Sequence, residues 1–123
     1  MNNDKREFIK KILIASVVSI SIIVLGIHYF FFSIQRFDGQ ELLETSVSPD
    51  NRYTVTAYLN NGGATVDYAV LCTVTDNKTG FKHNIYWQYH CYDAEIKWSD
   101  ETTVIINDIV LNVKKDIYDW RDQ

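Results

Sequence analysis

Cysteine and histidine, which supply most zinc ligands and many catalytic groups, are scarce in this chain. The sequence holds two cysteines and three histidines among its 123 residues. The densest cluster of reactive side chains is His90-Cys91-Tyr92-Asp93, with Glu95 nearby. A metal site needs three or four converging ligands, and strand alternation places His83 on the opposite face from His90. We therefore predict no metal site and no bound cofactor.

The same cluster is a poor candidate for nucleophilic catalysis. A cysteine nucleophile needs a base that takes its proton and a third group that orients the base. Adjacent residues on an extended chain point to opposite faces, so His90 is badly placed to serve Cys91. Gly62-Gly63 is also no phosphate-binding loop, because no helix and no Lys-Ser/Thr pair follows it. We therefore predict no catalytic residue.

Basic charge is in short supply after the first 11 residues. Residues 1–11 carry four bases and two acids, whereas the remainder carries eight bases and fourteen acids, a net charge of −6. Nucleic-acid phosphates require a basic face, so the sequence argues against a nucleic-acid partner. An acidic domain also does not suit adsorption to anionic lipid.

Charge is absent altogether from residues 12–32, a run of 21 residues without Asp, Glu, Lys or Arg. A helix of this length spans about 30 Å, the thickness of a bilayer core. The alternatives are a buried core helix, for which such runs are too long, and a cleaved signal peptide. The run ends in His28-Tyr29-Phe30-Phe31-Phe32 and lacks a small-x-small cleavage site. We predict a transmembrane helix that is retained as a signal anchor.

The charges that flank this run predict its orientation. Four bases precede it, whereas the first stretch after it offers Arg36 alone, with three acids. The preceding bases are Lys5, Arg6, Lys10 and Lys11. Basic flanks stay in the cytoplasm. We therefore expect a single-pass membrane protein with residues 1–11 as a cytoplasmic tail and everything after the helix outside the cytoplasm.

Beyond the helix, short alternating segments are separated by turn residues, and no helical period is present. We expect a stalk over 33–41, an antiparallel β domain over 42–113 and a charged tail over 114–123, loose or forming a short helical turn against the sheet. The expected strands cover residues 42–47, 52–59, 66–75, 81–89, 94–98, 102–106 and 109–113. The predicted fold class is mainly β: a transmembrane α-helix followed by a small antiparallel β-meander, as a rolled sheet or sandwich.

Alternation along two of these strands predicts a candidate binding face. It places Thr54, Thr56 and Tyr58 of one strand, and Tyr86 and Gln88 of another, on the face opposite the apolar residues. Aromatic side chains on a polar strand face are typical of contact surfaces. The alternative is a two-sided core, in which the sheet is rolled up or covered by its own tail.

Cys72 and Cys91 are the only cysteines, and outside the cytoplasm a lone pair in a small domain usually forms a disulfide. Closing a loop of about 19 residues would stabilise the domain by roughly 3 kcal/mol in the chain-entropy model. We predict this disulfide, with two separate buried thiols as the alternative.

Two stretches carry a family resemblance: SVSPDNRYTVTAYLNNGGATVDYAV and NIYWQYHCYDAEIKWSDETTVIIN. The chain resembles, over nearly its whole length, an uncharacterised family of small membrane-anchored proteins of Gram-positive bacteria, a domain of unknown function. The resemblance implies an envelope location and one extracytoplasmic β domain, and it carries no activity or site residue. Two hairpins also resemble β-propeller blades, but a domain of this size is too small for a closed propeller.

These patterns predict a membrane-anchored, extracytoplasmic binding module, with an envelope protein or a wall ligand as its partner. One alternative is an accessory subunit of a membrane complex that acts through its transmembrane helix. The other is a small envelope enzyme that uses Cys91 or Asp93.

Overall fold

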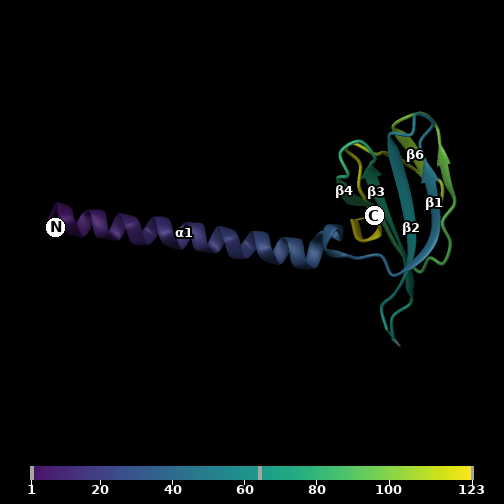
Figure 1. Cartoon of the computed structure of the whole chain (residues 1–123). Coiled ribbons are helices and arrows are strands. Elements are labelled where there is room, and N and C mark those ends of the chain that lie inside the picture. The colour runs from purple at the N-terminus through teal and green to yellow at the C-terminus, as the bar shows by residue number, and fades with distance from the viewer. Residues whose placement is uncertain (1, 64, 123) are drawn as a thin grey trace. The chain divides into compact units, whose positions relative to one another are not determined.

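The computed structural model describes residues 2–63 and 65–122. The chain divides into two compact units, Met1–Arg36 and Phe37–Gln123. The first unit is helical, and the second is built of β-strands (Figure 1).

Helix α1 covers Asn3–Phe32 and is followed by the short 3-10 helix η1, Ile34–Arg36. The side chain of Asn2 caps its N-terminus by accepting a hydrogen bond from the Lys5 amide at 3.0 Å. Among the described residues, α1 is the one helix that is long and apolar enough to cross a membrane. It starts well before the apolar run, because its charged first turns hold good helix formers such as Lys and Glu. The helix supports the predicted membrane anchoring.

Over its described residues, the β unit contains eight strands in two sheets. The first sheet has the order β1-β2-β3-β4-β8 and the second the order β5-β6-β7. The bounds are β1 Glu41–Val47, β2 Tyr53–Asn61, β3 Tyr68–Asp76, β4 Lys82–Tyr89, β5 Ile96–Trp98, β6 Thr103–Ile106, β7 Ile109–Asn112 and β8 Tyr118–Asp119. All neighbours are antiparallel except β4 and β8, which are parallel. The predicted fold class, mainly β with an N-terminal apolar helix, is confirmed.

Turn chemistry sets the register of these strands. The amide of Asn51 donates to the carbonyl of Ser48 at 2.9 Å, which closes the β1–β2 turn. Asn107 and Asp108 both have positive φ, at 47° and 70°, and they form the two-residue turn between β6 and β7. Asn and Asp tolerate this region better than other side chains.

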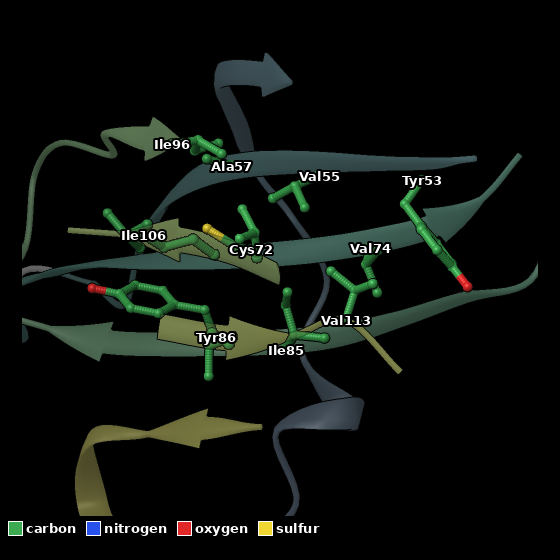
Figure 2. Packing of buried hydrophobic residues seen from close by; sticks show 13 residues of the cluster. Tyr53, Val55, Ala57, Cys72, Val74, Ile85, Tyr86, Ile96, Ile106 and Val113 are labelled. Carbon is green, nitrogen blue, oxygen red and sulfur yellow. The ribbon is translucent and has the colours of Figure 1, made fainter. Parts of the chain in front are cut away.

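The hydrophobic core lies between the two sheets (Figure 2). The large sheet contributes the inward-facing side chains of β2, β3 and β4. The small sheet contributes those of β5, β6 and β7, together with Val113 directly after β7. The cluster contains Tyr53, Val55, Ala57, Val70, Cys72, Val74, Ile85, Tyr86, Ile96, Val104, Ile106, Leu111 and Val113. The indole of Trp98 in β5 also donates to the hydroxyl of Ser46 in β1 at 3.0 Å, joining the two sheets at one edge.

A β-bulge in β4 reverses the predicted face of part of that strand. Cys72 of β3 pairs with Tyr86, but the next residue, Thr73, pairs with Asn84, so Ile85 is an extra residue in the ladder. Uninterrupted alternation would place Trp87 and Tyr89 on the same face of the sheet as His83 and Ile85. Instead, Trp87 pairs with Leu71 and lies on the sheet face opposite the main core.

That opposite face carries a second, smaller apolar layer. Leu71 of β3 has no exposed surface although it points away from the main core. Phe37 stacks on Trp87 with ring centroids 4.2 Å apart. The C-terminal 3-10 helix η2, Trp120–Asp122, adds Trp120, which stacks on Tyr89 at 5.3 Å.

Polar contacts hold the segment of residues 37–40 to this face. Asn60 of β2 donates to the carbonyl of Asp38 at 2.9 Å and accepts from the Gln40 amide at 2.9 Å. Asn84 of β4 donates to the carbonyl of Phe37 at 2.9 Å. The large sheet is therefore packed on both faces, as in the alternative of a two-sided core.

Candidate functional site

The five residues of the predicted binding face do not share one face. Thr54, Thr56 and Tyr58 lie together on the outer face of β2, where Tyr58 packs against Gly39. Tyr86 and Gln88 lie on the other face, because the bulge at Ile85 shifts the alternation of β4 by one residue. The assignment of Tyr86 and Gln88 to the Tyr58 face was therefore wrong.

Both cysteines are free thiols, so the predicted disulfide is not formed in this structure. Cys72 pairs with Tyr86 across the ladder, whereas the Cys91 amide donates to the carbonyl of Tyr68, four residues away from Cys72 along β3. Four strand residues span about 13 Å, and a disulfide joins α-carbons about 4.4–6.8 Å apart. Burial raises the pKa of the Cys72 thiol far above its usual range.

Tyr86 and Gln88 lie instead in a cleft of about 450 Å³ at the end of the β unit where β4 leads into residues 90–93. The β6–β7 turn forms its other side. The cleft is lined by Tyr86, Gln88, His90, Cys91, Tyr92, Asp93, Asn107 and Ile109. The cleft is shallow and open to solvent.

Asn107 is the residue that organises the cleft wall. Its side-chain amide donates to the carbonyl of Asp93 at 2.9 Å and to the Tyr86 hydroxyl at 3.3 Å, and it approaches the Cys91 sulfur at 3.6 Å. Its side-chain oxygen accepts from the Glu95 amide at 2.8 Å. Asn107 therefore fixes the shape of residues 91–95 around the Tyr86 hydroxyl.

Tyr86 reaches the cleft from inside the core. Its side chain is 1% exposed, and its ring stacks on Tyr118 with centroids 5.1 Å apart. Burial raises the pKa of the Tyr86 phenol to about 12, so the group keeps its proton at neutral pH. Among the described residues, this hydroxyl accepts one hydrogen bond, from Asn107, and donates none.

The rim of the cleft is held by Asp67, which precedes β3. Its carboxylate accepts from the Tyr92 hydroxyl at 2.5 Å and contacts His90 Nδ1 at 2.7 Å. The Tyr89 hydroxyl accepts from the Asp67 amide at 2.9 Å. The hydrogen bond from Tyr92, with help from His90, lowers the pKa of the Asp67 carboxyl. His90 has a positive φ of 55°, a backbone strain that this network stabilises.

The chemical groups of the cleft are not arranged as a nucleophile and a base. The Cys91 thiol donates to the carbonyl of Asp93 at 3.3 Å, and the Nδ1 of His90 is turned to Asp67. No hydrogen bond joins the thiol to the imidazole among residues 2–63 and 65–122. Within the same residues, no three His, Cys, Asp or Glu side chains are grouped for a metal. The arrangement is suited to holding a polar ligand.

Sequence reasoning missed Asp67 and Asn107. The sequence identifies Asn107 only as a turn residue. Asn107 and Tyr86 are far apart in the sequence, so no local pattern predicts their contact. Asp67 lies beside Tyr68, in a loop whose pairing with residues 90–92 depends on the β3–β4 register.

A model of a family described as a family of unknown function (DUF5412) matches residues 6–123. No curated protein and no solved structure matches the chain. The matched range includes both the apolar helix and the whole β unit.

Proposed function

The chain belongs to that family of unknown function, and we propose that it is a membrane-anchored binding module whose ligand occupies the cleft between residues 90–93 and the β6–β7 turn. The anchor is α1, and the β unit faces the extracytoplasmic side as part of the cell envelope. The observation that carries the proposal is the cleft itself, a shallow, open site of about 450 Å³ that combines buried and exposed tyrosines with amide and carboxylate groups.

The proposed orientation rests on the charges at the two ends of the apolar run. Four basic residues lie in the first turns of α1, and all are exposed. Their transfer across a bilayer is costly, so they favour the cytoplasmic side. The acidic β unit then lies outside, where the anionic inner leaflet does not repel it.

The proposed binding role rests on how the cleft is built. Asn107, Asp67 and Tyr86 fix its wall and rim by hydrogen bonds within the β unit. Such pre-formed sites lose little entropy when a ligand binds.

Orientation is tested with single engineered cysteines in a chain whose own free thiols are removed by Cys72→Ala and Cys91→Ser. A membrane-impermeant maleimide is applied to intact cells. We expect Glu101→Cys, in the exposed turn before β6, to be labelled, and Glu7→Cys, in the first turns of α1, to be labelled only after permeabilisation. Labelling confined to Glu7→Cys would reverse the proposed topology.

The binding role is tested with a photo-reactive benzoylphenylalanine at Tyr92, on the cleft rim. The matched control is the same amino acid at Phe81, another exposed aromatic residue, which precedes the opposite end of β4. We expect a cross-linked species in intact cells from position 92 and none from position 81. Equal cross-linking at both positions, or none at either, would refute the cleft as the binding site.

A further inference from the structure

We propose that the ligand of this cleft is an uncharged, hydroxyl-rich sugar ring, so that the module recognises a neutral glycan. This inference rests on the proposed binding function and narrows it to a chemical class. It follows from the hydrogen-bonding groups that the protein leaves unused in the cleft, from the aromatic surface at its rim and from its charge.

The first unused group is the hydroxyl of Tyr86. Its oxygen accepts from Asn107, but its proton has no acceptor among the described residues, and the side chain is almost completely buried. A buried donor without an acceptor is costly, and both Tyr86 and its hydrogen-bond partner Asn107 line the cleft. The cleft therefore offers a hydrogen-bond donor to a ligand oxygen.

The second unused group is the carboxylate of Asp93. It lines the cleft, and within the described part of the chain it has no hydrogen-bond or ion-pair partner, since only the Asp93 backbone carbonyl is bonded, to Asn107 and Cys91. An ionised carboxylate is an acceptor only. The ligand must therefore accept from Tyr86 and donate to Asp93, and a hydroxyl group does both, whereas an ammonium group only donates.

The rim supplies an aromatic surface. Tyr92 is 51% exposed, and its hydroxyl is fixed by Asp67. Its ring lies 5.7 Å from that of Tyr68, which is also exposed. A rigid, amphipathic ring of this kind buries a large area at low entropic cost, and the apolar C–H face of a sugar ring is a suitable partner.

Charge excludes acidic ligands. Among the described residues, no lysine or arginine lines the cleft. The carboxylate of Asp93 has no cationic partner there, and that of Asp67 at the rim is already paired with His90. Lys97, on the neighbouring strand β5, is paired with Glu95 at 2.7 Å. An anionic sugar would meet repulsion without a compensating cation.

The test uses the full chain in nanodiscs that contain no glycolipid. Backbone amides of residues 90–93 and the side-chain amide of Asn107 are followed by NMR during titration with four probes: cellotetraose, chitotetraose, the tetramer of glucosamine and tetragalacturonate. The first two are neutral, the third is cationic and the fourth is anionic. We expect saturable shifts of the cleft signals with at least one neutral tetramer and none with tetragalacturonate.

Two variants test the named groups, and one serves as a control. Tyr86→Phe removes the hydroxyl and keeps the ring, and we expect about tenfold weaker binding from the loss of one hydrogen bond. Asp93→Ala, at an exposed residue, should weaken binding without affecting folding. Tyr53→Phe makes the same change as Tyr86→Phe at a buried tyrosine outside the cleft and should leave the affinity unchanged.

The outcomes separate the ligand class from the binding role. Cleft shifts with the cationic or the anionic tetramer alone would overturn the glycan inference and leave the binding module intact. No shift with any tetramer, together with cross-linking at position 92, would do the same. Unchanged sugar affinity in both Tyr86→Phe and Asp93→Ala would overturn the assigned recognition groups.

Discussion

Replacing Leu71 by alanine tests whether the second face of the large sheet is a packed layer. The Leu71 side chain is fully buried beneath the layer that contains Phe37 and Trp87. Truncation of a buried leucine to alanine costs about 2–5 kcal/mol, from lost transfer free energy and from the cavity that remains. The covering segment of residues 37–40 is short and can partly collapse, so we expect about 2–3 kcal/mol.

The assay is urea denaturation of the full chain in detergent micelles, followed by tryptophan fluorescence. All three tryptophans, at positions 87, 98 and 120, lie in the β unit, so the signal reports on that unit. The matched control is Leu42→Ala, the same truncation at a leucine of β1 that is 62% exposed. It should change the free energy of unfolding by less than about 0.5 kcal/mol. Equal, small effects at both positions would refute the second layer and would mean that this face of the large sheet is not packed.

Three further predictions concern the linker, an ion pair and the thiols. Gly39→Ala places a methyl carbon 2.3 Å from the Tyr58 ring. The resulting overpacking should lower the free energy of unfolding by about 1–3 kcal/mol. An unchanged midpoint of urea denaturation would contradict the close contact. Arg52 binds Asp76 bidentately at 2.8 and 2.9 Å and holds the pKa of that carboxyl well below its usual range. The stability that the pair contributes is therefore full above the unfolded pKa of about 3.9 and is lost as the pH falls below it. Arg52→Met should reduce this loss of stability at low pH in pH-dependent denaturation curves, and an unchanged loss would exclude the pair as its source. Without reductant, a thiol reagent should label both cysteines after unfolding but chiefly Cys91 in the native protein, since Cys72 is buried; labelling that requires reductant would show a disulfide.

Much of the fold follows from local signals in the sequence. The alternation of residues 53–59 and the turn residues at 48–51 and 107–108 locate β2, β6 and β7 to within two residues, because period-2 burial and positive φ are properties of short stretches. The apolar run likewise identifies the helix. These features need no knowledge of which strand lies beside which.

The site could not be predicted in the same way. The bulge at Ile85 depends on how β4 pairs with β3, and it moved Tyr86 from the predicted outer face into the core. Strand β8 is two residues long and pairs in parallel with β4, a contact with no local signal. The Asn107–Tyr86 bond joins residues that only the packing of the two sheets brings together.

Residues 37–40 are where the chain leaves the helical unit and enters the β unit, so any tension on the anchor loads this segment first. Asn60 of β2 and Asn84 of β4 hydrogen-bond to this segment from two different strands, which lie on either side of β3. Tension is therefore carried by β2 and β4 before it reaches the edge strand β1. Tension applied to β1 alone would break its hydrogen bonds to β2 one pair at a time. A tether attached in this way is released only when its hydrogen bonds to both strands are broken.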